Sequence, residues 1–373
     1  MPQRPPLTPL VDSLPATVPF VGPETQERNH GRPFRARLGA NENGFGPSPK
    51  VVEAMRVAAP DVWKYGDPES HDLRQALSAL HGVAPENIVV GEGIDGLLGL
   101  IVRQYAEPGT PVVTSLGAYP TFNYHVAGFG ARLVTVPYEG DRESLNGLLE
   151  AVRREEARIV YLSNPDNPMG TWWEADEIDR FIAALPETTM LVLDEAYCET
   201  APASALPPLE PARPNVLRMR TFSKVYGLAG LRCGYAIGKA EVIRAFDKVR
   251  NHFGMTRITQ AAALAALNDR AHLEWVVDAV DACRRRLTAI AEAHGLAALP
   301  SATNFVTIDC GSDGAFAMRV LEALGKRDVF VRKPMAPGLD RCIRVSVGPE
   351  AEIAVFEAEL GGALEAAQRV GEW

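Results

Sequence analysis

The chain has 373 residues, 46% of them hydrophobic, with a formal net charge of −9 and a pI near 5.4. This length can form a large domain and a second, smaller lobe, whereas the acidic balance and dispersed basic residues argue against a nucleic-acid-binding protein. The apolar runs are too short to span a bilayer and the chain shows no signal pattern, so we expect a cytoplasmic protein. Its five cysteines are scattered and its histidines lack ligand spacing, which indicates reduced thiols and no metal site.

Residues 1–37 form the predicted amino-terminal arm. Its first 33 residues are rich in proline and show no sustained periodicity, so we expect an extended arm that packs on a neighbour or frays. After the arm, Ser48 followed by Pro49 predicts the start of a helix. A second helical pattern over residues 69–81 leads to a short β-branched strand at residues 87–90.

Short apolar strands then recur along the chain, with helix-length segments between most of them. They are expected at residues 112–114, 133–136, 159–162, 190–193, 216–219 and 235–237. This alternation predicts an α/β fold whose largely parallel sheet is covered by helices on both faces. Beyond residue 294, strand-like segments at 304–309, 329–331 and 343–347 mix with two helices. We therefore predict a large domain over residues 38–270 and a smaller α+β domain over residues 271–373.

Ligands of parallel α/β sheets bind at the carboxyl ends of strands, and polar groups follow several of these strands. The turn Gly91-Glu-Gly-Ile-Asp95 opens a helix whose amides can bind phosphate, although such turns are commoner as plain punctuation between strand and helix. Tyr119 can stack on a planar ring or belong to the core. Asn167, between two prolines, can donate to a ring oxygen or simply form a turn.

The strand at residues 190–193 ends in Asp194-Glu-Ala-Tyr197. A carboxylate at this place can keep a pyridinium nitrogen protonated, which makes the ring an electron sink. The alternative interpretation of Asp194 and Glu195 is a helix amino-terminal cap.

Lys224 lies within the stretch from Met219 to Tyr235, and the candidate site is organised around it. Hydroxyls of Thr221 and Ser223 flank its amine, and Arg232 follows eight residues later. Such hydroxyls and a guanidinium can converge on one phosphate while the amine reaches an aldehyde, which suggests pyridoxal 5′-phosphate. Taken alone, this glycine-rich stretch is equally compatible with a surface loop.

Several motifs occur together in a specific order. They are Asn-Glu-Asn, Asn-Pro-Asp-Asn-Pro-Met-Gly, Asp-Glu-Ala-Tyr, Thr-Phe-Ser-Lys, Leu-Ala-Gly-Leu-Arg and Ile-Arg-Val-Ser. Over about residues 38–347 the chain therefore resembles the fold-type I aminotransferases, and within them the histidinol-phosphate aminotransferase subgroup. The resemblance implies a homodimer that binds pyridoxal phosphate and moves an amino group between glutamate/2-oxoglutarate and a second small molecule.

The resemblance also implies residue roles. Lys224 is expected to bind the cofactor covalently, Asp194 to pair with the pyridine nitrogen, and Tyr197 to hold the ring oxygen; these three are the catalytic candidates. Among the other expected cofactor contacts, Asn167 binds the ring oxygen and Tyr119 stacks on the ring. The expected phosphate contacts are the amides of Gly93, Ile94 and Asp95, the side chains of Thr221, Ser223 and Arg232, and Tyr65 of the partner subunit. The substrate-binding candidates are Arg344, Arg332 and Asn43.

The chain departs from the subgroup pattern at three places, namely Asn43-Gly-Phe-Gly46, Ile94, and residues 252–256 with Arg257 after them. These departures concern the second substrate more than the cofactor. Histidinol phosphate is the expected substrate. An aromatic or other amino-acid aminotransferase, a lyase similar to threonine-phosphate decarboxylase, and a catalytically silent cofactor-binding module stay as alternatives.

Overall fold

A seven-stranded sheet forms the framework of the larger part of the molecule. The computed structural model describes residues 5–16 and 21–369. The strand order is β2-β8-β7-β6-β5-β3-β4. The strands are β2 (Ile88–Gly91), β3 (Pro111–Ser115), β4 (Arg132–Val136), β5 (Ile159–Ser163), β6 (Met190–Asp194), β7 (Val216–Thr221) and β8 (Gly234–Ile237). Neighbours from β7 to β4 are parallel and β8 is antiparallel to both its neighbours, which confirms the mostly parallel sheet.

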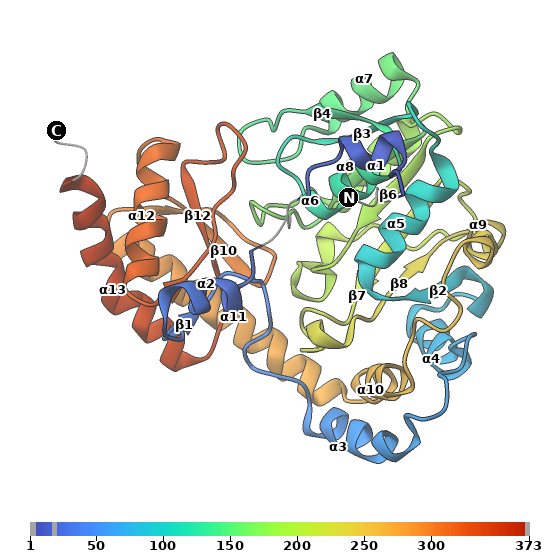
Figure 1. Cartoon of the computed structure of the whole chain (residues 1–373), viewed down its shortest axis with the longest axis horizontal. Helices are drawn as coiled ribbons and strands as arrows, with labels where there is room; N and C mark the ends of the chain where they lie inside the picture. The colour runs from blue at the N-terminus through green and yellow to red at the C-terminus, as the bar shows by residue number, and fades with distance from the viewer. Residues whose placement is uncertain (1–4, 17–20, 370–373) are drawn as a thin grey trace.

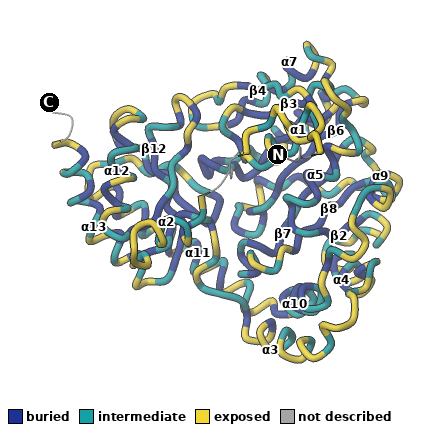
Figure 2. The backbone as a smooth tube through the Cα atoms, viewed as in Figure 1, coloured by how far each residue is buried: buried dark blue, intermediate teal, exposed yellow. Residues whose placement is uncertain are grey.

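Helices cover both faces of this sheet because the central strands β5 and β6 carry mainly apolar, buried side chains on both faces. Successive residues of a strand point to opposite faces, so Ile159 packs with one helical layer and Val160 with the other. One layer contains α5 (Gly93–Tyr105) and α6 (Pro120–Gly128), and the other contains α7 (Leu145–Glu155) and α8 (Ala175–Ala184). The strands are accordingly dark in Figure 2, whereas exposed residues lie on the outer helices and loops.

The carboxyl-terminal part carries a second sheet, of order β12-β10-β9. Its strands are β9 (Ala297–Ala298), β10 (Phe305–Asp309) and β12 (Cys342–Ser346), packed with α12 (Gly314–Lys326) and α13 (Glu350–Arg369). The long helix α11 (Arg270–Ala293) runs from the large sheet's side to this part (Figure 1). The predicted domain boundaries at residues 37 and 270 stay predictions.

Four further helices belong to the large part. Three of them, α3 (Pro49–Ala58), α4 (His71–His81) and α10 (Arg257–Leu267), lie together below the sheet in Figure 1, and the short α9 (Ala240–Ala245) lies beside β2. The Ser48 hydroxyl accepts the Lys50 amide at 3.1 Å, which confirms the predicted start of α3. No helix of the described ranges is both long and apolar enough to cross a membrane.

The prediction of an extended arm is wrong for two of its segments. The arm contains α1 (Pro9–Ser13) and α2 (Pro23–His30), each with proline in its first turn. The Thr8 hydroxyl caps α1, and Gly31 ends α2 in the left-handed conformation. These helices depend on their caps and not on hydrophobic periodicity. Beyond them, β1 (Ala36–Arg37) pairs with β11 (Val329–Phe330). Residues 1–4 and 17–20 of the predicted arm lie outside the described residues.

A buried ion network lies under the carboxyl end of β6. Glu195 is 1% exposed and accepts hydrogen bonds from the guanidinium groups of Arg218 and Arg220, the latter at 2.9 Å from Nε to Oε2. Burial alone disfavours the charged carboxylate, but the two guanidinium groups hold the pKa of Glu195 below its ordinary value. The carboxylate therefore joins β6 to β7 and does not cap a helix.

Replacing Glu195 with alanine should destabilise the fold by about 3–5 kcal/mol, because it leaves two buried guanidinium groups without their carboxylate. Equilibrium denaturation of the purified protein measures this change. Glu53→Ala, which breaks the fully exposed ion pair with Arg56, is the matched control and should change stability little. Equal losses in the two variants would contradict this account of the network.

Candidate functional site

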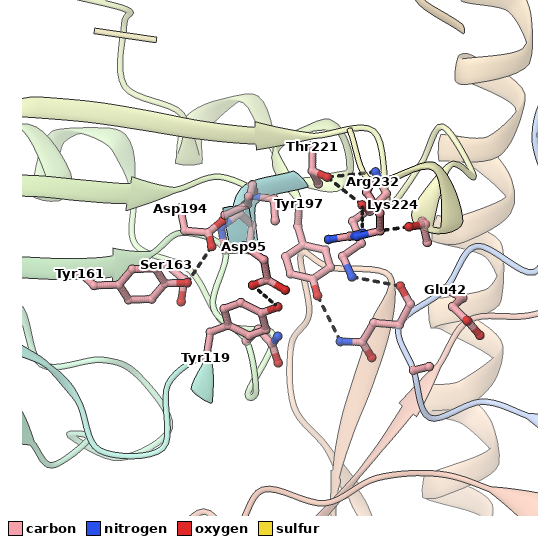
Figure 3. A pocket seen from close by; sticks show the side chains of 18 residues that line it. Glu42, Asp95, Tyr119, Tyr161, Ser163, Asp194, Tyr197, Thr221, Lys224 and Arg232 are labelled. Atoms are coloured by element: carbon pink, nitrogen blue, oxygen red, sulfur yellow. Dashed lines mark hydrogen bonds between the residues drawn. The ribbon is translucent and has the colours of Figure 1, made fainter. Parts of the chain in front are cut away.

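A cavity of about 330 Å³ opens at the carboxyl ends of the central parallel strands (Figure 3). Residues from the ends of β5, β6 and β7 reach the same edge because these strands are parallel and in register. Ten of the predicted site residues line it, namely Ile94, Asp95, Tyr119, Asn167, Asp194, Tyr197, Thr221, Ser223, Lys224 and Arg232. Four candidates, Asn43, Tyr65, Arg332 and Arg344, do not, and Gly93 lies directly before Ile94 at the start of α5.

Asp194 is the buried acidic group of the cavity and is 5% exposed. Its Oδ1 accepts the Ala196 amide at 2.9 Å, and its Oδ2 accepts the Tyr161 hydroxyl at 2.7 Å. Burial raises the pKa of Asp194 to about 6, while both hydrogen bonds and the nearby amine of Lys224 limit the rise. Burial also raises the pKa of Tyr161 well above its ordinary value, so the phenol stays a donor. At neutral pH the cavity thus contains an oriented carboxylate.

The amine of Lys224 lies on the opposite wall, close to the aromatic ring of Tyr197 (Figure 3). Nζ is 5.3 Å from the ring centroid and donates to the Asn41 carbonyl at 3.2 Å. Asn41 also donates through Nδ2 to the Tyr197 hydroxyl at 3.1 Å. Among residues 5–16 and 21–369, no carboxylate forms an ion pair with Lys224. The amine is therefore held by neutral groups and can react with a ligand.

Hydrogen-bond donors that can bind an anion, and that have no acidic partner, lie together beyond Lys224. Ser223 Oγ accepts the Thr221 hydroxyl at 2.9 Å and Arg232 Nη1 at 3.4 Å. The guanidinium of Arg232 covers Gly93, where an added Cβ would lie 2.5 Å from Nη2 and the backbone has a φ of +73°. The α5 amides begin at this point without a side-chain cap, and Arg232 forms no ion pair with a described carboxylate. Free amides, hydroxyls and a guanidinium together suit a phosphate group.

The side wall of the cavity is formed by an aromatic ring. The Tyr119 hydroxyl donates to Asp95 Oδ1 at 2.9 Å, which ties the start of α6 to the first turn of α5 (Figure 3). Burial and the Asp95 carboxylate raise the pKa of Tyr119, so the phenol stays neutral. A planar ligand ring can stack on this fixed neutral surface.

Arg344 reaches the cavity indirectly, through Asn167. Its Nη1 donates to Asn167 Oδ1 at 2.6 Å, which leaves the Asn167 amide nitrogen available to a ligand oxygen. The Arg344 guanidinium lies 5.1 Å from the Phe305 ring centroid, and its buried Nε has no hydrogen-bond partner within the described chain. Arg332 pairs with Arg344 through the backbone, but its side chain donates to the Val21 carbonyl at 2.6 Å.

Two other candidates lie away from the cavity. Tyr65 is 78% exposed, its ring is 4.9 Å from that of Phe253, and its carbonyl accepts Arg257 Nη2 at 2.9 Å. The Asn43 amide donates to the Val225 carbonyl at 2.9 Å, so it fixes the loop behind Lys224. Roles for both residues in ligand binding stay predictions.

The cavity also contains residues that sequence reasoning missed, chiefly Asn41, Glu42, Tyr161 and Ser163. The two-residue spacing of Tyr161 and Ser163 places both on the cavity face of β5, so strand alternation could have found them. Asn41 and Glu42 belong to the Asn-Glu-Asn motif that contributes to the family resemblance, but nothing local to the motif places them in this cavity. Within the described ranges, no group of three or more side chains suitable for a metal ion is present.

Known proteins match both this fold and this chain's sequence. The family model for aminotransferase class I and II matches residues 36–358. A histidinol-phosphate aminotransferase of Anaeromyxobacter sp. (strain Fw109-5) is 37% identical over 365 residues, covering 96% of this chain and 99% of the relative. Histidinol-phosphate aminotransferase 1 of Nitrosococcus oceani is 36% identical, with 92% of each chain covered.

A solved structure agrees over nearly the whole chain. It is histidinol-phosphate aminotransferase from Sinorhizobium meliloti in complex with pyridoxal-5′-phosphate, with a TM-score of 0.94, 57% identity and 98% of both chains covered. The resemblance seen in the sequence motifs is thereby confirmed. The chain belongs to the class I and II aminotransferases, a family of pyridoxal-phosphate-dependent enzymes.

Proposed function

We propose that this chain transfers an amino group between glutamate/2-oxoglutarate and histidinol phosphate/imidazole acetol phosphate, with pyridoxal phosphate as cofactor. One observation carries the cofactor assignment: a single cavity holds an amine without a carboxylate partner, a buried carboxylate and a set of phosphate donors. The names of relatives that are 37% and 57% identical support histidinol phosphate as the second substrate.

Pyridoxal phosphate, when bound, supplies an aldehyde carbon that takes up the amino group and a ring that accepts electrons. Lys224 would hold the cofactor through that carbon in the resting enzyme, and its Nζ would be the base that accepts the proton from the substrate carbon. Asp194 keeps the pyridine nitrogen protonated, and the Tyr161 hydroxyl and Ala196 amide orient its carboxylate.

The remaining residues hold the cofactor in register. Tyr197 and Asn167 bind the ring oxygen, and Tyr119 stacks on the ring. The phosphate is bound by Thr221, Ser223, Arg232 and the amides of Gly93, Ile94 and Asp95. A phosphate held by so many fixed donors keeps the reactive carbon within reach of Lys224.

We also propose a homodimer in the cytoplasm, in which Tyr65 of the partner subunit completes the phosphate site. The 78% exposure of Tyr65 and its contact with Phe253 support a role at an interface. A subunit that is fully active as a monomer at assay concentration would contradict the homodimer.

Lys224→Ala should abolish amino transfer while the protein still binds pyridoxal phosphate, because the ring and phosphate contacts come from other residues. Turnover assays and a cofactor-binding titration by absorbance measure the two properties separately. Normal turnover by the folded variant would exclude the proposed function.

Asp194→Asn should keep cofactor binding roughly intact and slow proton removal by on the order of a hundredfold or more, since an amide cannot balance the charge of a pyridinium. Single-turnover kinetics with glutamate measure this step.

The same substitution should change how the stability of the cofactor-free protein depends on pH. The pKa of the Asp194 carboxyl group is raised from 3.8 to about 6, so the stability that this group contributes is lost as pH rises between these values. The asparagine variant should lack this loss, and an identical pH profile would contradict the assigned burial effect.

Arg344→Ala should weaken both half-reactions by about 2–5 kcal/mol if the guanidinium binds a desolvated substrate anion. Single-turnover kcat/KM for glutamate and for histidinol phosphate measures each loss. Arg257→Ala is the comparison and should impair at most the second half-reaction. Unchanged values in Arg344→Ala would place the anion site elsewhere. If the wild-type enzyme does not use histidinol phosphate but uses aromatic amino acids, the assignment of histidinol phosphate as the second substrate is wrong. A decarboxylated product would indicate the lyase instead.

A further inference from the structure

Two buried carboxyl groups lie directly behind the cavity wall that carries Ser163 and Asn167. Glu143 is 1% exposed and precedes α7, and Asp166 is 3% exposed in the turn after β5. The neighbouring Asp141 pairs with Arg341 at 2.7 Å. By contrast, no described lysine or arginine forms an ion pair with Glu143 or Asp166. A buried acid pair without a cation requires another form of compensation.

Hydrogen-bond donors surround both carboxyl groups. Glu143 Oε1 accepts the Ser163 amide at 2.9 Å and lies 2.8 Å from the Ser163 hydroxyl oxygen, and Oε2 accepts the Ser115 hydroxyl at 2.6 Å. Asp166 accepts the Tyr138 hydroxyl at 2.8 Å and the Met169 amide at 2.9 Å. Glu143 therefore joins the ends of the adjacent strands β3 and β5, and Ser163 links it to Asp166 in the turn that follows β5.

The proton count at Ser163 determines the charge of the pair. Ser163 Oγ lies 2.8 Å from Glu143 Oε1 and also 3.2 Å from Asp166 Oδ1, but it has only one proton to donate. One of the two carboxyl groups must supply the other proton. Burial raises the pKa of both carboxyl groups, and the repulsion by the Asp166 carboxylate raises that of Glu143 further. We therefore take Glu143 as the member that carries the proton at neutral pH.

Other charged or titratable groups around the pair do not replace this proton. Those that interact with it are Tyr138 after β4, Tyr161 on β5 and Arg344 on β12. Both tyrosines have pKa values well above their ordinary value and stay neutral, and the Arg344 guanidinium is bound to Asn167.

The turn that contains Asp166 also carries Asn167. The Asp166 amide donates to the Thr171 carbonyl at 2.8 Å, and the Asp166 carbonyl accepts the Gly170 amide at 3.0 Å. A displacement of the Asp166 side chain would consequently move the next residue, whose amide faces the cavity.

We propose that Glu143 is a positioning residue for Asn167 and that it holds the turn from Ser163 to Gly170 as the neutral partner of Asp166. This inference rests on the proposed role of Asn167 at the cofactor's ring oxygen. Glu143 itself does not line the cavity.

The first test compares holoenzyme melting temperatures of wild type and Glu143→Gln across pH. The glutamine side chain stays neutral at every pH and offers a donor group on one side and an acceptor oxygen on the other, as the protonated carboxyl does. The folded-state pKa of Glu143 is raised from 4.5 to about 8. The stability that this group contributes is therefore fully present below pH 4.5 and is lost as pH rises from 4.5 to about 8. The wild-type melting temperature should therefore fall relative to that of the variant as pH rises to about 8. Parallel curves would overturn the inference.

Glu199→Gln is the matched control for this test. Glu199 is another carboxyl group whose pKa is raised by burial, to about 6, and it lies outside the cavity lining. The difference in melting temperature between Glu199→Gln and wild type should reach its full size near pH 6. Between about pH 6 and about pH 8, only Glu143→Gln should therefore remove the fall in melting temperature that wild type shows.

The second test is a double-mutant cycle on the dissociation constant of pyridoxal phosphate. Glu143→Leu should weaken binding about tenfold in wild type, with no further loss in an Asn167→Ala background, and Glu143→Gln should bind normally. Additive losses would overturn the inference alone. Unchanged binding in Asn167→Ala would overturn the ring-oxygen role as well. If Glu143→Leu does not fold, the glutamine comparison still decides.

Discussion

The buried carboxylate of Asp194 is the constraint on which the rest of the site depends. It is 5% exposed, and within the described chain the only cation that lowers its pKa appreciably is the amine of Lys224 across the cavity. Such a group is costly unless fixed donors and a positive charge compensate it. Tyr161 and Ala196 supply the donors, and a protonated ring nitrogen would supply the charge. The parallel register, which pairs Ser163 with Asp194 and Asp194 with Met219, makes this arrangement possible.

The features that sequence could predict are those with local causes. Short strands that are mainly apolar, separated by helix-length segments, indicate a sheet covered on both faces, and polar residues directly after them indicate the edge where ligands bind. Asp194, Thr221 and Lys224 lie at or just after strand ends and line the cavity as expected. The start of α3 follows from Ser48 and Pro49 for the same reason, because a cap involves only neighbouring residues.

The features that sequence could not predict depend on contacts between distant residues. Arg344 binds Asn167 across 177 residues, and Asn41 binds Tyr197 across 156 residues. No local pattern indicates either contact, so the hydrogen bond from Arg344 to Asn167 and the position of Asn41 in the cavity were not predicted. The proton shared between Glu143 and Asp166 has the same origin, since it arises only when β3, β5 and their loops meet in a dry interior. The prediction of an extended arm failed for another reason: the helices α1 and α2 are short and depend on caps, so they leave no hydrophobic periodicity in the sequence.

The central claim is that Lys224 is the covalent anchor of pyridoxal phosphate in this cavity. Treatment of the holoenzyme with borohydride fixes the bond between a lysine and the cofactor, and peptide mass mapping then locates the modified residue. The account predicts one pyridoxyl phosphate group on the peptide that contains Lys224, with other lysines unmodified. A label on a different lysine, or no label on a protein that retains its visible absorbance, would contradict it.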